Sequence, residues 1–288
     1  FQAEDGIRDI AWSPDSRHLA TVSDDNTAIL WDTETGAKLY TLQGHRSNVV
    51  VVRWSPDSSR IVTGGGQYSA IGLREANPDF TTRIWDARSG RSIHIMMPHM
   101  ASVTSVCWSP DGSRLASCSA DSTTIIWNAT TGDTLHILGG HVTGVDNAYW
   151  SPSGDRILTR GGDSNAILWD AISGKRLFTL ESFSDNRAAN WSPDGRQIAT
   201  TNLNSTLIWD AATGKIINTL LGHTAPVNDA VWSADGKYIA TASEDRTSIL
   251  WDALSGEKLT TLSTSKYAIM TVSWSPDGSR IAVPSGKT

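Results

Sequence analysis

Residues 222–262 read GHTAPVNDAVWSADGKYIATASEDRTSILWDALSGEKLTTL, and this stretch decides the fold. It contains four runs of about five residues rich in Ile, Val, Thr, Tyr and Trp, separated by clusters of Gly, Asp and Ser. Such runs are typical of short β-strands joined by tight turns. The stretch predicts strands over residues 227–232, 238–243, 247–251 and 258–262.

The same phrase recurs along the chain with a period of about 42 residues. One class of tryptophan heads a Trp-Ser-Pro-Asp turn or a close variant of it, and its members are Trp12, Trp54, Trp108, Trp150, Trp191, Trp232 and Trp274. A second class precedes an acid or amide, and its members are Trp31, Trp85, Trp127, Trp169, Trp209 and Trp251. All 13 tryptophans belong to this repeat, which indicates stacked supersecondary units.

The composition excludes several classes of protein. A chain of 288 residues with 39% hydrophobic residues can bury a core, which excludes wholesale disorder. No segment approaches the roughly 18–20 apolar residues of a membrane helix, so no membrane partner is expected. The net charge of −6 argues against nucleic acid as a partner. The 2 cysteines are too few for a disulfide framework, and the chain is expected to be cytoplasmic.

A single four-stranded sheet of this size has two apolar faces and cannot bury both alone. Radial packing of such sheets around an axis buries the faces and leaves only short edges. The expected fold class is therefore all-β, a β-propeller of four-stranded antiparallel blades with six complete blades and half of a seventh. A single domain over 1–288 is expected to contain blades at 1–42, 43–96, 97–138, 139–180, 181–220, 221–262 and, in part, 263–288.

Two further motifs connect the repeat to a known family. Trp-Asp closes the third strand, and Gly-His opens the next unit at Gly44-His45, Gly140-His141 and Gly222-His223. Over essentially the whole chain this pattern resembles the WD40 repeat family of β-propellers, in particular its bacterial arrays. The resemblance implies a hydrogen-bonded tetrad of His, Ser or Thr, Asp and Trp within a blade. The matching sets are His45, Thr63, Asp79 and Trp85; His99, Ser117, Asp121 and Trp127; His141, Thr159, Asp163 and Trp169; and His223, Thr241, Asp245 and Trp251.

These sets contain the residue types of a catalytic triad. A triad, however, needs an exposed nucleophile and an oxyanion hole. One copy in each of four blades is typical of a structural brace, so we expect no enzyme activity and no catalytic residue. Glu4 stands where the histidine of the first blade would fall, and the fifth blade has no histidine near residues 182–186. Both blades are expected to be less firmly braced.

No cofactor and no metal site are expected. His94 and His99 flank the sequence Met96-Met97-Pro98, which offers soft ligands. His99 already belongs to a tetrad and His94 lies on a predicted strand, so metal binding is not the favoured interpretation.

Partner binding is expected at the loops. In propellers of this family the loops that join blades and those between the second and third strands share one face, which often binds peptides or proteins. Trp54 and Trp85 are 31 residues apart, against 19 for Trp108 and Trp127, so the second unit carries 12 extra residues around 67–77. Such an insertion is often a binding feature, although a tolerated surface loop is the alternative. The candidate partner-binding residues are Arg46, Asn48, Tyr68, Ile71, Leu73, Arg74, Asn186, Arg187 and Glu244.

The sequence therefore predicts a non-catalytic protein-interaction scaffold or sensor propeller that binds protein or peptide partners. The alternative is an accessory propeller of a larger signalling enzyme, an NTPase or kinase, whose catalytic domain is absent; further domains of the same chain are expected. Binding of a small ligand in the central channel is a third possibility. The seventh unit has strands predicted at 268–274 and 280–283 and then stops, so we interpret the chain as a fragment.

Overall fold

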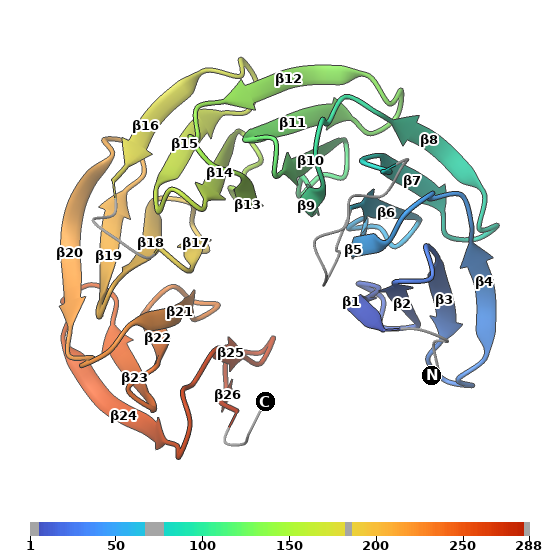
Figure 1. The fold of residues 1–288 in the computed structure, drawn as a ribbon. Helices are drawn as coiled ribbons and strands as arrows, with labels where there is room; N and C mark the ends of the chain where they lie inside the picture. The colour runs from blue at the N-terminus through green and yellow to red at the C-terminus, as the bar shows by residue number, and fades with distance from the viewer. Residues whose placement is uncertain (1–5, 67–77, 182–185, 285–288) are drawn as a thin grey trace. The chain divides into compact units, whose positions relative to one another are not determined.

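The computed structural model describes residues 6–66, 78–181 and 186–284, and these residues form β-strands and turns with no helix among them. The strands form six four-stranded sheets and one two-stranded sheet (Figure 1). In each sheet the strands follow chain order and neighbours run antiparallel. The predicted all-β fold class, six complete blades and a partial seventh, is confirmed.

The strands of the blades have the following bounds. The first three blades comprise β1 (Ile7–Trp12), β2 (His18–Ser23), β3 (Ala28–Asp32) and β4 (Lys38–Leu42); β5 (Val49–Trp54), β6 (Arg60–Gly65), β7 (Thr82–Asp86) and β8 (Ser92–Met96); and β9 (Val103–Trp108), β10 (Arg114–Ser119), β11 (Thr123–Asn128) and β12 (Thr134–Gly139). The next three comprise β13 (Val145–Trp150), β14 (Arg156–Gly161), β15 (Ala166–Asp170) and β16 (Arg176–Leu180); β17 (Ala189–Trp191), β18 (Gln197–Asn202), β19 (Ser205–Asp210) and β20 (Lys215–Leu221); and β21 (Val227–Trp232), β22 (Tyr238–Ser243), β23 (Thr247–Asp252) and β24 (Lys258–Thr264). The seventh comprises β25 (Ser273–Trp274) and β26 (Ile281–Ala282).

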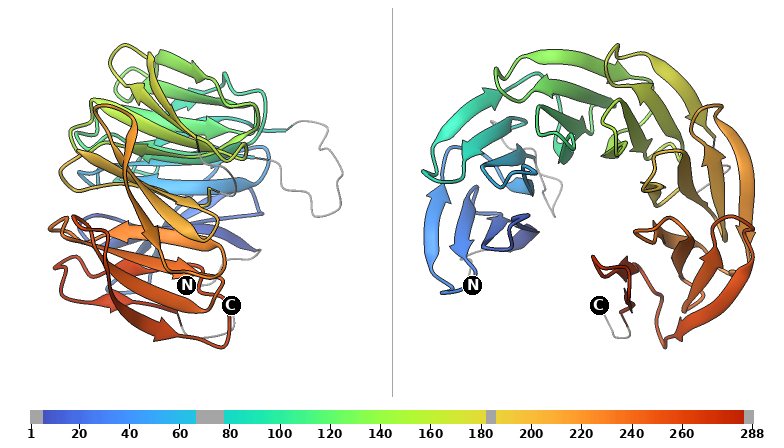
Figure 2. Two further views of the ribbon diagram at one scale, coloured as in Figure 1. Left: turned by 90° about the vertical axis from the view of Figure 1, so that its left-hand side faces the viewer. Right: turned by 180° about the vertical axis from the view of Figure 1, so that it is seen from behind.

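The chain divides into two compact units. Unit 1 contains Phe1–Trp150, Gly161–Asp163 and Asp170–Lys175, and unit 2 contains the remainder. Within unit 1, β4, β8 and β12 follow one edge of the row of blades, while β1, β5 and β9 follow the opposite edge (Figures 1 and 2). Within unit 2, β20 and β24 lie at one edge of their blades and β17 and β21 at the other.

The core lies between neighbouring blades. Val62 and Ile84 of the second blade pack in one buried cluster with Val106, Trp108 and Leu115 of the third. Four of the tryptophans that head the Trp-Ser-Pro-Asp turns also donate their indole N–H to a backbone carbonyl of the preceding blade. These bonds are Trp54 to Ala11 at 2.9 Å, Trp108 to Arg53 at 3.4 Å, Trp150 to Cys107 at 3.2 Å and Trp274 to Val231 at 3.3 Å. Each such tryptophan therefore joins two blades by apolar contact and by a hydrogen bond.

A second joint lies six residues after these tryptophans. The guanidinium of Arg60 stacks over the Trp108 ring at 4.8 Å and donates to the carbonyl oxygens of Ala129 at 2.9 Å and Gly112 at 2.7 Å. Arg114 stacks on Trp150 at the same distance of 4.8 Å. In the first blade His18 occupies this position and stacks on Trp54 with ring centroids 5.9 Å apart. A planar cation or ring here clamps a blade to the next one.

A third joint explains the glycine of the turn after the third strand. Gly36, Gly90, Gly132, Gly174, Gly214 and Gly256 all have φ between 67° and 79°, the left-handed conformation that the turn predicts for glycine. In four of them a Cβ would also meet a ring of the preceding blade at 2.5–2.9 Å, and these rings are Tyr40, His94, His136 and Phe178. Three of the rings add a hydrogen bond to the same turn, from Tyr40 to Arg88 O, His94 to Thr130 O and His136 to Ile172 O.

The seventh blade differs from its prediction. The strand expected over 268–274 is confined to Ser273–Trp274, and the one expected over 280–283 to Ile281–Ala282. The backbone before this short strand bonds to the sixth blade: Ile269 N donates to Ser243 O at 3.0 Å and Val272 N to an oxygen of Asp229 at 3.2 Å.

The third joint generates a matched pair of variants. Gly214→Ala places a Cβ against the Phe178 ring, whereas Gly36 has the same backbone conformation and nothing within 4 Å of its Cβ position. We expect Gly36→Ala to lower the free energy of unfolding by about 1–2 kcal/mol through backbone strain alone. Gly214→Ala should cost about 1–3 kcal/mol more through overpacking. Urea denaturation measures both, and equal losses would contradict the joint.

Candidate functional site

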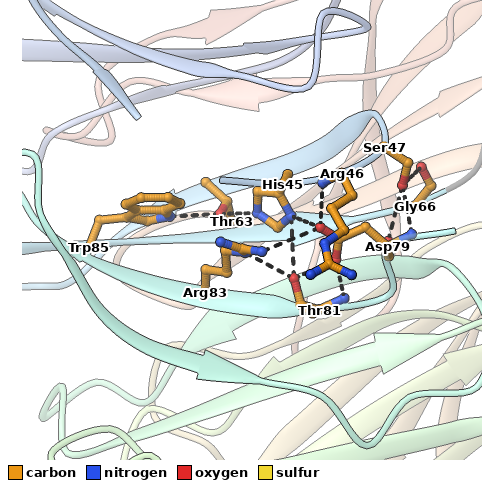
Figure 3. Close-up of polar contacts among 9 residues, drawn as sticks. All are labelled: His45, Arg46, Ser47, Thr63, Gly66, Asp79, Thr81, Arg83 and Trp85. Atoms are coloured by element: carbon orange, nitrogen blue, oxygen red, sulfur yellow. Dashed lines mark hydrogen bonds and ion pairs between the residues drawn. The ribbon is translucent and has the colours of Figure 1, made fainter. Parts of the chain in front are cut away.

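The second blade shows how a tetrad is assembled. The Trp85 indole donates to Thr63 Oγ1 at 2.8 Å, and His45 Nε2 lies 2.8 Å from the same hydroxyl oxygen. His45 Nδ1 lies 3.2 Å from Asp79 Oδ2, and the loop that joins the first and second blades carries this histidine (Figure 3). All four side chains are buried. The tetrad therefore ties that loop to two strands and to the turn before β7.

The third and sixth blades repeat the three contacts of the second, and the His–Asp and Trp–Thr contacts recur in the fourth. In the third blade His99 lies 3.0 Å from Asp121 and 2.7 Å from Ser117 Oγ, which accepts the Trp127 indole proton at 2.9 Å. In the sixth blade the distances from His223 to Asp245 and to Thr241 are 2.8 Å and 2.7 Å, and the Trp251 indole lies 2.8 Å from Thr241. In the fourth blade His141 lies 3.0 Å from Asp163, and Trp169 donates to Thr159 at 2.9 Å.

The donors of a tetrad define one protonation pattern. The indole N–H can only donate, so the Ser or Thr oxygen accepts it and gives its own proton to His Nε2. Nδ1 then carries the remaining proton and donates it to the aspartate. Burial favours this neutral histidine, because it lowers the pKa of His45, His99 and His223 against the opposing effect of their aspartates.

The order Ser117–His99–Asp121 is that of a catalytic triad, but its surroundings differ. Ser117 has no exposed surface, and the Trp127 indole occupies a lone pair of its hydroxyl. A substrate carbonyl has no approach to Oγ, and the geometry is that of satisfied buried polar groups.

The first and fifth blades contain part of the same arrangement. Trp31 donates to Thr21 at 2.9 Å, and Trp209 donates to Thr200 at 2.8 Å. Glu4, which the sequence places at the histidine position of the first blade, lies outside the described residues.

Each tetrad aspartate also fixes the residue that follows the histidine. The backbone N–H groups of Arg46, Met100, Val142 and Thr224 donate to the aspartates of their blades at 2.7, 2.9, 3.0 and 2.9 Å. All four of these residues are nevertheless exposed, and Met100 and Val142 are 86% and 84% exposed. Met100 and Val142 are not among the candidate residues chosen from the sequence, although their place directly after the tetrad histidine could have indicated them.

Two of the candidate residues contact each other. Arg187, which precedes β17, forms an ion pair with Glu244 in the turn between β22 and β23, and it also donates to Asn228 at 2.5 Å. The two side chains remain 32% and 40% exposed. This pair joins the loop ends of the fifth and sixth blades.

The other candidates take no part in that ion pair. Asn48 donates to Asp24 at 2.5 Å, and Arg8 pairs with the same carboxylate at 2.6 Å. Asn186 is buried, and within the described part of the chain neither of its side-chain polar atoms has a hydrogen-bond partner, so its side chain is not part of an open surface. The candidates of the insertion at 67–77, namely Tyr68, Ile71, Leu73 and Arg74, lie outside the described residues.

The described residues contain no group of three His, Cys, Asp or Glu side chains placed to hold a metal ion. His94, considered beside His99 for that role, donates instead to the Thr130 carbonyl at 2.9 Å. Nowhere in the described ranges is there a helix with the length and apolar character needed to cross a membrane.

Comparison with known proteins agrees with the blade geometry. The family model described as "WD domain, G-beta repeat" matches residues 1–32, 36–86, 90–128, 132–170 and 214–252. The chain belongs to the WD40 family.

Several curated WD40 proteins are similar to parts of this chain. Ribosome assembly protein 4 of Chaetomium thermophilum is 29% identical over 32% of this chain and 25% of its own length. The peroxisomal targeting signal 2 receptor of Homo sapiens is 30% identical over 38% of this chain and 32% of its own length. An uncharacterized WD repeat-containing protein of Synechocystis is 34% identical over 37% and 27%. The matches span no more than about a third of these relatives' lengths.

The WD40 tetrad of the sixth blade provides a stability test. His223→Ala should lower the free energy of unfolding by about 1–3 kcal/mol, because it leaves Asp245 and Thr241 buried without their shared partner. Chemical denaturation measures the loss. An unchanged midpoint would show that the tetrad does not brace the blade.

The WD40 tetrads also predict how stability depends on pH. Burial lowers the pKa of His45, His99 and His223 below 6.5, so the unfolded chain takes up protons at a higher pH than the folded chain. Their contribution is complete above pH 6.5 and is lost as the pH falls from 6.5 through the lowered values. The urea midpoint of unfolding should fall as the pH is lowered from about 7 to about 5, and it should fall less for His223→Gln than for the unaltered chain. If the midpoints of the two chains fell by the same amount over this range, His223 would not be one of the groups responsible.

Proposed function

We propose that this chain is a non-catalytic interaction scaffold or sensor that binds protein or peptide partners at the loop ends of its blades. The observation that carries the proposal is the fixed presentation of the residue after each tetrad histidine. Its backbone N–H is held by a buried aspartate while its side chain is exposed, as for Met100 and Val142. A loop backbone that is ordered before binding loses less conformational entropy when a partner arrives.

The same end of the blades offers varied chemistry. In unit 1 these loop ends present a cation at Arg46 and apolar groups at Met100 and Val142, and in unit 2 they present an exposed ion pair between Arg187 and Glu244. Apolar anchors surrounded by polar and charged groups are typical of protein-binding surfaces. The insertion at 67–77 belongs to the proposed surface by its sequence position between the second and third strands of its blade.

Names of relatives support this class of function. One similar protein is named as a receptor for a targeting signal and another as a ribosome assembly protein. Both names describe recognition of, or assembly with, other molecules.

The proposal is tested with a partner captured by the whole chain and then purified. Met100→Ser, Val142→Ser, Arg187→Ala and a chain lacking 67–77 are each compared with the unaltered chain by calorimetry. Loss of about tenfold or more in affinity is expected for at least the two apolar anchors. Leu254→Ser is the matched control, because Leu254 is 91% exposed and lies in the turn after the third strand, at the other end of its blade. An equal effect of the control, or no effect of any loop variant, would refute the surface.

A further inference from the structure

The third strand of the second blade contains a residue that breaks its repeat. Two residues before Trp85 stands Arg83, which is 7% exposed. The other five complete blades place an aliphatic side chain there, namely Ile29, Ile125, Ile167, Leu207 and Ile249, and each of these is also at most 7% exposed. Burying a guanidinium is unfavourable unless its charge is well compensated. Packing therefore favours an aliphatic residue where this blade has an arginine.

Arg83 has two polar contacts inside its blade. Its Nη2 lies 3.5 Å from Asp79 Oδ2, and its Nε donates to Thr81 Oγ1 at 3.1 Å (Figure 3). Asp79 is already bonded by His45, by the Arg46 backbone and by the Thr81 hydroxyl. Arg83 is thus an additional cation beside a carboxylate that other groups already supply with hydrogen bonds.

The sixth blade shows that a tetrad does not require this cation. Asp245 accepts from His223, from the Thr224 backbone and from the Thr247 hydroxyl, the same set of donors as Asp79 has. Ile249 occupies the arginine position there. Bracing of the blade therefore does not explain Arg83.

A pocket lies directly beside Arg83. Its volume is about 520 Å³, and Arg46, Arg83, Phe80, Ile95 and Met97 contribute to its lining. Figure 3 shows the Arg46 and Arg83 side chains both directed to the Asp79 end of the tetrad. Ile95 pairs with Arg83 across the ladder from β7 to β8, and Ile95 and Met97 are 52% and 72% exposed. The pocket combines a cationic end with an apolar wall.

The charges of this pocket select its ligand. Two guanidinium groups and the Asp79 carboxylate leave one net positive charge, which a single carboxylate would neutralise. A guanidinium is the side chain best suited to bind a carboxylate through paired N–H groups. The apolar wall would be left exposed by a small inorganic anion but would be covered by an aliphatic or aromatic neighbour of that carboxylate.

We propose that this pocket binds a carboxylate side chain of an acidic peptide, with the adjacent apolar residue of the peptide against Phe80, Ile95 and Met97. The proposal rests on the peptide-binding function proposed above and assigns one ligand chemistry to one position of that surface. In this proposal Arg83 binds the ligand, although an aliphatic residue at the same position would pack better.

The test measures binding and stability of the whole chain together. The probes are fluorescein-labelled peptides with a central Glu flanked on both sides by Leu, Met, Ile, Val or Phe, each paired with the isosteric Gln peptide and with a phosphoserine peptide. Arg83→Ile restores the residue of the other blades, and Arg46→Ala removes the second cation. Arg196→Ile is the control, because the Arg196 side chain is 86% exposed in a turn of the fifth blade.

The best Glu peptide should bind about tenfold or more tightly than its Gln partner, and Arg83→Ile should abolish that preference while Arg196→Ile preserves it. Arg46→Ala should reduce the preference. The thermal midpoint of Arg83→Ile should equal or exceed that of the unaltered chain, because an aliphatic side chain replaces a buried charge.

Three results would overturn the proposal. One is a panel in which no Glu peptide binds better than its Gln partner, and another is an Arg83→Ile chain with a lower midpoint and unchanged binding. The third is a phosphoserine peptide that binds about tenfold more tightly than the Glu peptide, which would reassign the site to phosphate esters. Loss of captured-partner binding in the Met100 and Val142 variants, together with any of these results, would leave the proposed function standing and remove only the pocket.

Discussion

A carboxylate buried inside a blade is stable only if nearby groups donate hydrogen bonds to it. In this chain some of those donors belong to the loops between blades, so the same bonds determine the conformation of these loops. In the sixth blade Asp245 accepts from His223, from the Thr224 backbone and from Thr247, and these bonds outweigh the effect of burial and lower its pKa to about 2. Since one donor is the backbone of a loop that joins two blades, satisfying the charge also orders the loop. The same hydrogen bonds therefore stabilise the blade and fix the conformation of its surface loop.

Much of the fold was predictable because the same pattern of strands and turns recurs in every copy of the repeat. The strands expected at 227–232 and 238–243 occur with those bounds, and the turn glycines have the expected positive φ. The joints between blades were not predictable in the same way. The contact of Arg60 with Trp108, or of Phe178 with the position of Gly214, links residues that belong to different copies of the repeat. Reading one copy at a time does not reveal which residues face each other.

The candidate surface was predictable in position but less so in composition. The sequence indicates Arg187 and Glu244 only as separate polar residues, and the structure shows that they form an ion pair between two blades. Met100 and Val142 are not among the sequence candidates, although each directly follows a tetrad histidine and is exposed in the structure. Arg83 was detectable, since aligning the six copies on their Trp-Asp or Trp-Asn step shows one arginine among aliphatic residues. Its meaning required the pocket and the second arginine beside it.

The joint between an outer strand and the following turn has a consequence for how such chains change. The turn has glycine in every complete blade, but the side chain that packs against it differs and is Tyr40, His94, His136, Phe178 or Asn218. Because a residue without a side chain accepts any of these shapes, neither partner of the joint depends on the identity of the other. Copies of the repeat can therefore be duplicated, exchanged or reordered during evolution without a compensating substitution at this contact, which leaves the loop residues free to diverge.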